Sequence, residues 1–261
     1  AALAAWLTEP NHPLVARVMV NRIWQGHFGT GIVATASDFG RNGEAPSHPE
    51  LLDWLASEFI ASGWSIKAMH RLIVLSATYR QTSVHQNLPA TALDQEARWL
   101  WRYPARRLEA ETIRDNLLFV AGRLNLTHGG PGFDLFAQRG GLSGFTPIET
   151  FTNEGLRRMI FAHKVRRERD VVFGAFDCPD AGQSTATRRI STTPIQALNL
   201  LNSPFALEQA EMLAQRIRQE VGNEPRVLIT RLWLRCFSRP PSDQELAAAE
   251  DLLTRYDLTA V

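Results

Sequence analysis

The stretch that decides the fold class is SHPELLDWLASEFIASGW, residues 47–64. It begins as a capping box, in which Ser47 accepts a free amide hydrogen of the first turn while Glu50 reaches back, with Pro49 inside that turn. Apolar residues follow at helical spacing until Gly63 offers a stop. The stretch therefore predicts an amphipathic helix with a defined start and end.

A second helix is expected directly after the first. Ser65 is a favourable N-cap, and apolar residues recur behind it at helical spacing. Trp64 lies between the two predicted helices and is well placed to pack in the corner. The residues expected on the apolar face of the second helix are Ile66, Met69, Leu72 and Ile73.

The same helix-start pattern returns near the C-terminus. Residues 193–196 and 242–245 form two further capping boxes, and Ser203 with Pro204 forms another start. Apolar spacing predicts two more helices, at about residues 13–25 and 108–124.

Two glycine-rich stretches, residues 28–46 and 127–155, are predicted to be loops. After the second loop, the segments 159–161 and 171–173 have the content of β-strands and could pair as a ribbon. The expected fold class is therefore mainly α: an irregular multi-helix domain with long glycine-rich loops and room for a small β-ribbon.

Length and composition fit a folded globular protein. The 261 residues, 44% hydrophobic and 21% charged, allow one domain over 1–261, or lobes 1–125 and 156–261 joined by the glycine-rich loop 126–155. The chain does not begin with Met, so we expect a fragment of a longer protein. No run of about 18 apolar residues occurs, and no transmembrane segment is expected.

Charge and motifs exclude several classes of function. A formal net charge of +1 gives no general attraction to nucleic acid, so we expect no nucleic-acid partner. Zinc, haem-attachment, P-loop and dinucleotide motifs are absent from the sequence, and we expect neither a metal nor a cofactor within this segment. Cys178 and Cys236 could form one disulfide, which their spacing does not decide.

Candidate binding residues come first from a polar concentration at residues 102–115. Arg106 and Arg107 could act as forked donors to an anion or a sugar, with Arg114 on the same helix. The alternative is a solvated helix face with ion pairs one turn apart, such as Arg107 with Glu111.

A second basic region ends in Arg188 and Arg189, just before the helix start at residues 193–196. Free amides and guanidinium groups could converge there on an anion. The alternative is that these arginines pair with the nearby carboxylates of Glu168, Asp170, Asp177 and Asp180. Glu109 and Asp177 are the candidates for catalytic acid and base, although a sequence gives no distance between carboxyl groups.

Blocks of sequence follow one another in a recognisable order over about residues 10–240. In the first half they are NHPL (11–14), VNRIW (20–24), FGTGIV (28–33), DFG (38–40), PSHPELLDWL (46–55), GW (63–64), RLI (71–73) and SATYR (76–80). In the second half they are RRLEAE (106–111), IRD (113–115), FDCPD (176–180), RR (188–189), STTPIQAL (191–198) and LNSPF (201–205). Together they resemble the domain of unknown function 1553, the planctomycete-type surface domain. Asp38 and His48, which lie within these blocks, complete the candidate binding residues.

The resemblance implies a location and neighbouring domains for this chain, but no reaction. Such domains usually end large secreted or surface proteins that often carry a cytochrome-c-like haem domain. We therefore expect a periplasmic, secreted or cell-surface location, neighbouring domains of the same polypeptide as partners, and haem only in such a neighbour. No catalytic residue carries over from the family.

Two functions remain open at this point. The first is a binding or scaffolding module of an exported multidomain protein, linked in some cases to cytochrome-c-like electron-transfer domains. The alternative is an enzyme that acts on an extracellular, anionic polysaccharide. In that case the residues that hold the anionic groups would be Arg106, Arg107, Arg188 and Arg189.

Overall fold

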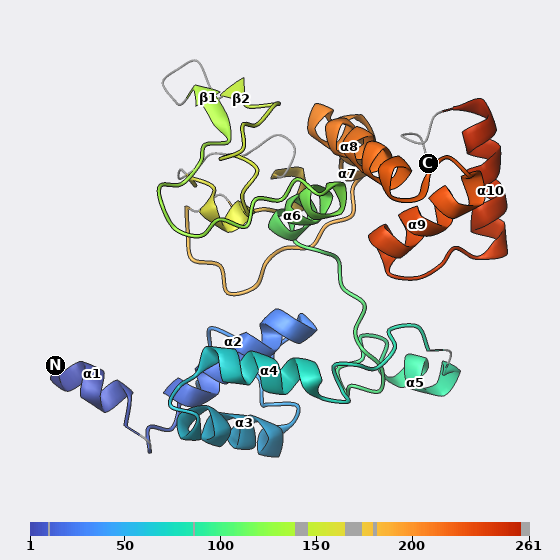
Figure 1. The fold of residues 1–261 in the computed structure, drawn as a ribbon. Coiled ribbons are helices and arrows are strands. Elements are labelled where there is room, and N and C mark those ends of the chain that lie inside the picture. The colour runs from blue at the N-terminus through green and yellow to red at the C-terminus, as the bar shows by residue number, and fades with distance from the viewer. Residues whose placement is uncertain (10, 86, 139–145, 165–173, 180–181, 257–261) are drawn as a thin grey trace. The chain divides into compact units, whose positions relative to one another are not determined.

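The computed structural model describes residues 1–261 except 10, 86, 139–145, 165–173, 180–181 and 257–261 (Figure 1). Most of the regular structure in the described residues is helical. The strands among these residues form one two-stranded sheet. The predicted mainly α fold class is therefore confirmed. Within the described ranges, no helix is both long and apolar enough to span a bilayer.

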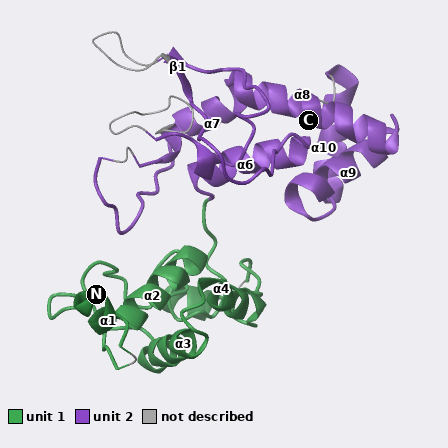
Figure 2. Ribbon diagram, turned by 60° about the vertical axis from the view of Figure 1, so that its left-hand side comes forward, with its two compact units in different colours: residues 1–107 green, residues 108–261 purple. Residues whose placement is uncertain are grey.

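The chain divides into two compact units, Ala1–Arg107 and Leu108–Val261 (Figure 2). The division lies between residues 107 and 108 and not in the loop 126–155, where the sequence suggested a joint between lobes. That loop supplies buried side chains to the core of the second unit, among them Phe133 and Phe136. The loop 126–155 is therefore part of the second unit and not a linker between units.

Unit 1 is built on three helices that pack against one another: α2 (Val15–Phe28), α3 (Pro49–Ala61) and α4 (Ile66–Leu75). The short helices α1 (Ala2–Leu7) and α5 (Leu88–Leu93) bury no side chain. The most deeply buried residues of the core are Val20, Ile32, Leu55, Phe59 and Met69.

The corner between α3 and α4 forms as the sequence predicts. Ser65 caps α4, because its Oγ accepts a hydrogen bond from the Ala68 amide at 3.2 Å. Gly63 has a φ of +70°, the left-handed conformation that ends many helices. The Trp64 ring packs edge-on against Phe59 with ring centroids 5.3 Å apart.

Two details of this region differ from prediction. The capping box expected at Ser47 is wrong, because His48 is the N-cap of α3 and no side chain caps it. The Ser47 amide and hydroxyl both donate to the Ile32 carbonyl, at 2.9 and 3.2 Å, so a contact with the preceding loop takes the group that would cap the helix. On α4, Ile66 and Leu72 are exposed, so its buried face is narrower than expected.

Unit 2 begins with α6 (Ala110–Ala121), which packs against α8 (Pro204–Val221). The helix α9 (Pro225–Phe237) contacts α8 on one side and α10 (Asp243–Arg255) on the other. Between α6 and α8 the chain forms the loops of this unit and the helix α7 (Pro194–Asn202).

The predicted helix starts of unit 2 are confirmed. The helices α7 and α10 begin with complete capping boxes, closed by the side chains of Gln196 and Glu245 respectively. At α8 a serine hydroxyl accepts the Ala206 amide hydrogen at 3.2 Å. The confirmed N-cap residues are Thr193, Ser203 and Ser242.

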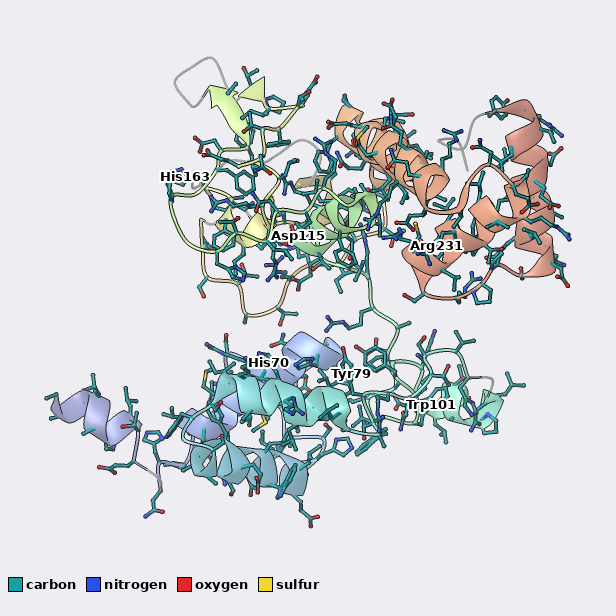
Figure 3. The ribbon with its side chains drawn as sticks, in the orientation of Figure 1. His70, Tyr79, Trp101, Asp115, His163 and Arg231 are labelled. Carbon is teal, nitrogen blue, oxygen red and sulfur yellow. The ribbon has the colours of Figure 1, made fainter. Side chains whose placement is uncertain are left out.

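The small ribbon forms at a different place from the one predicted. It pairs β1 (Phe136–Gln138) with β2 (Thr146–Pro147), antiparallel, inside the glycine-rich loop. Residues Met159–Phe161 form a 3-10 helix, and residues 171–173 lie outside the described part of the chain. The carboxylate of Asp115, labelled in Figure 3, accepts the first amide hydrogen of that 3-10 helix at 2.7 Å. This tertiary contact explains why a segment with strand-like content is not extended.

Glu220, near the end of α8, accepts hydrogen bonds from three arginines: Arg216, Arg231 (Figure 3) and Arg235. Burial alone would raise its pKa, but the hydrogen bonds from Arg231 and Arg235 outweigh burial and lower the pKa of Glu220 to about 2. A carboxyl whose pKa is lower in the folded state stabilises the fold above its ordinary pKa, and this contribution is lost as the pH falls through the folded value.

We expect Glu220→Gln to lower the free energy of unfolding by about 1 kcal/mol at neutral pH, the scale of a partly exposed ion-pair network. The difference from the native protein should shrink as the pH falls from 4.5 towards 2, because the native carboxyl then takes up a proton as well. Urea unfolding followed by circular dichroism at several pH values measures this. Glu211→Gln, an exposed change on the same helix, is the control. A difference that does not depend on pH would contradict the assignment.

Candidate functional site

A group of polar side chains meets at the start of α6 in unit 2. Glu109 is the N-cap residue of this helix and Glu111 lies in its first turn. A carboxylate in the first turn is favoured by the helix dipole. The sequence gives α6 a definite end as well, because Gly122 adopts the left-handed conformation just beyond it. The position of Glu111 is thus fixed by a short, well-bounded helix.

Arg188 joins both carboxylates. Its Nη1 lies 2.7 Å from Glu111 Oε2 and 3.5 Å from Glu109 Oε2. Burial favours the neutral form of Glu111, but the hydrogen bond and charge of Arg188 outweigh burial and lower the pKa of Glu111. Glu111 is therefore an anion at neutral pH, held by an arginine 77 positions later in the chain.

A thiol and an amine complete the group. Cys178 Sγ lies 3.6 Å from Glu111 Oε1, and Lys164 Nζ lies 2.9 Å from the same sulfur. Burial raises the pKa of the Cys178 thiol, and the hydrogen bond from Lys164 partly opposes that rise. We call these five residues the Glu111 cluster: Glu109, Glu111, Lys164, Cys178 and Arg188.

The charges of the Glu111 cluster balance. Two carboxylates face one guanidinium and one ammonium group, so the cluster has no positive excess to attract an anion. Arg188 therefore pairs with carboxylates of the α6 start that are distant in sequence, and not with Asp177, one of the nearby carboxylates expected as its partners. Glu109, a candidate catalytic acid, lies against Arg188 in this arrangement.

Asp177, the other acid/base candidate, connects two segments of the backbone. Its carboxylate accepts the Ser191 amide hydrogen at 2.7 Å, and the Ser191 hydroxyl lies 2.9 Å from both carboxylate oxygens. Asp177 has a φ of +62°, a conformation that Asp tolerates better than most residues. Gln196 extends the network, because its Nε2 donates to Ser191 Oγ and to the Ala175 carbonyl. Asp177 thus fixes the loop that leads into α7.

Arg114 lies in the core of unit 2, not on a surface. Its side chain is 0% exposed and donates to the backbone carbonyls of Gly155 and Arg157, at 2.5 and 3.0 Å. The guanidinium also lies about 5 Å from three aromatic rings, those of Phe133, Phe151 and Phe205. Arg114 therefore has a structural role, and a ligand at the surface does not reach it.

The remaining basic candidates are distributed over both units. Arg106 donates to the Gln25 and Gly26 carbonyls near the C-terminal end of α2, where a cation is favoured. Arg107 is the last residue of unit 1 and is half-buried. Arg189 is exposed and makes no ion pair with the residues that the structure describes. A common anion site of the two arginine pairs stays a prediction.

The other two candidate residues of unit 1 lie in turns. Asp38 Oδ1 accepts the Gly40 amide hydrogen at 2.8 Å and closes a tight turn. His48 Nδ1 lies 2.9 Å from the Ser47 hydroxyl, and its ring packs edge-on near Trp99. Unit 1 also contains a pair of histidines in direct contact, because His27 Nε2 lies 2.7 Å from His70 Nδ1 (Figure 3). Burial lowers the pKa of His27, and the charges of His70 and Arg106 lower it further.

An exposed apolar surface on α7 is the second notable feature of unit 2. The one buried residue of this helix is polar, Gln196, which is held by the loop network. The apolar residues point outward: Ile195 is 61% exposed, Leu198 53% and Leu201 68%. We call these three residues the α7 face. They recur at positions i, i+3 and i+6 and so lie along one side of the helix.

Sequence reasoning missed the thiol–amine contact and the α7 face. Lys164 and Cys178 are 14 positions apart, with no motif that links them. The apolar spacing of α7 is visible in the sequence, but such spacing normally marks a buried side. Both cysteines are free thiols. Among the described residues no group of three or more His, Cys, Asp or Glu side chains could hold a metal ion.

Comparison with known proteins gives one finding. A family model described as "PSD1: Protein of unknown function (DUF1553)" matches residues 1–253. No curated protein matches the chain. No solved structure matches it either.

Proposed function

The chain belongs to the DUF1553 family of proteins of unknown function, and from that premise we propose that it is a binding module whose contact surface is the α7 face. The observation behind this proposal is the reversed polarity of α7. A helix normally turns its apolar residues to the core and its polar residues to water. In α7 a polar residue faces inward and three large apolar residues face outward.

This arrangement is costly unless something covers the α7 face. Full burial of a Leu or Ile side chain is worth about 1.5–3 kcal/mol, so covering three half-exposed side chains yields roughly 3 kcal/mol or more. The helix is also rigidly presented. Its N-terminus has a complete capping box, and Gln196 ties it to the Ala175 carbonyl at 2.9 Å. A rigid apolar face loses little entropy when a partner binds.

The flanking residues indicate the chemistry of the partner. Ile190, 73% exposed, precedes α7, and next to it stands the exposed cation Arg189. A matching surface would be apolar and would place a carboxylate opposite Arg189. We assign this surface to a neighbouring domain of the same polypeptide, in an exported or surface protein. A haem-bearing domain of the cytochrome-c type is one such neighbour; the family resemblance supports this context.

The polysaccharide enzyme is the weaker alternative. It requires arginines available to anionic groups and two carboxyls available for proton transfer. In the Glu111 cluster Arg188 pairs with two carboxylates. Asp177 accepts hydrogen bonds from the amide and the hydroxyl of Ser191. Binding by the α7 face does not require Arg188 or Asp177 to leave these partners.

The α7 face can be tested without disturbing the fold. We expect the double change Leu198→Asp and Leu201→Asp to weaken binding of the neighbouring domains by about tenfold or more, because two exposed apolar anchors are replaced by charges. The matched control is Leu88→Asp with Leu93→Asp on α5, where both leucines are at least 83% exposed. Titration calorimetry with the neighbouring domains, expressed separately, measures the affinity.

Three results would count against the proposal. Equal affinity of the α7 variant and the native chain would show that the face is not the contact surface. An equal loss in the α5 control would mean that added charge alone is responsible. Self-association of the native chain that disappears in the α7 variant, seen by light scattering, would assign the face to a second copy and overturn the assignment to a neighbouring domain.

A further inference from the structure

Lys164 and Cys178 are in direct contact although no function described above uses them. The Nζ and Sγ atoms are 2.9 Å apart with nothing between them. Both residues follow well-anchored backbone. The amide of His163 donates to the Phe133 carbonyl at 2.7 Å, and Asp177 is tied to the Ser191 amide at the same distance. The backbone just before the amine and the backbone just before the thiol are therefore each anchored to unit 2 by a hydrogen bond of their own.

We propose that Lys164 and Cys178 are a redox-sensitive pair, joined by a covalent Sγ–Nζ bond when a peroxide oxidises the thiol. The proposal does not depend on the α7 face or on the identity of the partner. It assigns a modification site to residues that lie 14 positions apart and meet only through the fold.

The chemistry proceeds in two balanced steps. In the first, the sulfur of Cys178 attacks one oxygen of a hydroperoxide; the O–O bond breaks, a sulfenic acid forms, and water or an alcohol leaves. In the second, the Lys164 nitrogen attacks that sulfur; the S–O bond breaks, water leaves, and a sulfenamide remains. The sulfur is oxidised by two electrons and the peroxide is reduced by two. The ammonium group of Lys164 gives up one proton before it attacks and another as the bond forms, one of which leaves with the water.

Glu111 faces the thiol and stays ionised during these steps, and the proton that Lys164 loses before it attacks goes to solvent, because Lys164 is exposed. Glu111 Oε1 lies 3.6 Å from the sulfur, while Oε2 is occupied by Arg188 at 2.7 Å. One carboxylate oxygen is thus held by a guanidinium and the other faces the thiol. Closure of the bond removes the positive charge of Lys164, while Arg188 remains to balance Glu111.

Cys236 is the natural comparison within the same unit. It lies on α9, and its sulfur has no hydrogen-bond partner among the described residues. Burial raises the pKa of both thiols, so neither is activated by its pKa alone. The adjacent amine distinguishes Cys178. Attack on the peroxide requires the thiolate, so the reaction should accelerate as the pH rises towards the pKa of Cys178, which is set by burial, Lys164, Glu111 and Arg188.

The test treats the whole chain with hydrogen peroxide at equimolar concentration and measures intact and peptide masses. We expect a product lighter by two hydrogens, in which peptides containing Lys164 and Cys178 are joined, and its complete reversal by a thiol reductant. Because a Cys178–Cys236 disulfide would give the same intact mass, the experiment is repeated with Cys236→Ser. The linked product should persist there, at the same rate.

Lys164→Arg is the decisive variant, because it keeps the charge beside the sulfur but presents a poorly nucleophilic guanidinium. We expect no linked product from it. Cys178 should stop at the sulfenic acid with one equivalent of peroxide and progress to sulfinic acid only when a second equivalent is added. Loss of the product in Cys236→Ser would identify a disulfide and overturn the proposal. Oxidation of Cys178 in the native chain without a link to Lys164 would overturn it as well.

Discussion

Replacing Arg114 by methionine should destabilise unit 2 by about 3 kcal/mol or more. The change preserves most of the side-chain length but removes every donor of a residue that is 0% exposed. Two backbone carbonyls, those of Gly155 and Arg157, then lose a charged donor, and a hydrogen bond to a charged group contributes about 1.5–3 kcal/mol. The stacking of the guanidinium on three phenylalanine rings is lost too.

Arg114→Lys should recover only a small part of this loss. A lysine keeps the charge but lacks the planar fork that reaches two carbonyls at once. The control is Arg226→Met in the same unit, where the arginine is exposed and pairs with Glu250; we expect a change below about 0.5 kcal/mol. Hydrogen exchange of the α6 amides reports on unit 2 directly, whereas tryptophan fluorescence would not, since six of the seven tryptophans are in unit 1. Unchanged exchange in Arg114→Met would contradict the assigned role.

The sequence predicts helices best where local chemistry and packing agree. The starts at Ser65, Thr193, Ser203 and Ser242 are all confirmed, because each serine or threonine caps its own helix without competition. Ser47 fails for a physical reason. Its hydroxyl meets the Ile32 carbonyl, which is distant in sequence and so invisible to a local pattern.

Tertiary contacts also explain why the segment 127–155 is part of a core and why the ribbon forms at another place than predicted. Glycine content marks the segment 127–155 as a loop, but a composition does not show that Phe133 and Phe136 from this loop complete a core with α6. Likewise the apolar segment at Met159–Phe161 could form a strand by content alone. The Asp115 carboxylate, 44 positions earlier, fixes its first amide instead.

The candidate site was predictable in part. Polar concentrations in the sequence pointed to Glu109 and Arg188, and the structure brings these two together at 3.5 Å. Lys164 and Cys178 could not be found, because their contact depends on two loops whose paths the sequence does not fix. Arg114 shows the opposite error: a basic residue within a polar stretch was expected at the surface, and the fold buries it completely.

Asn21→Ala should destabilise unit 1 by about 3 kcal/mol. Asn21 is 0% exposed, and its amide makes both hydrogen bonds to one residue of the glycine-rich loop: Nδ2 donates to the Val33 carbonyl at 3.0 Å, and Oδ1 accepts the Val33 amide hydrogen at 2.8 Å. Val33 is itself buried, so the substitution leaves a donor and an acceptor without these bonds, at about 1–3 kcal/mol for each group. Urea unfolding monitored by tryptophan fluorescence measures the effect, because Trp24 lies in the same core.

Gly31→Ala tests the same contact from the loop side. A Cβ at this position would lie 2.6 Å from both Asn21 Nδ2 and the Val33 carbonyl oxygen, so the loop must move away from α2. We expect a loss of about 2 kcal/mol, of the size found for overpacked sites. The double variant should cost less than the sum of the two single changes, since Asn21→Ala removes two of the three obstructing atoms, Nδ2 and Oδ1 of Asn21. Arg22→Ala, an exposed neighbour on α2, is the control. Strict additivity, or a control as damaging as Asn21→Ala, would show that the amide does not hold the loop.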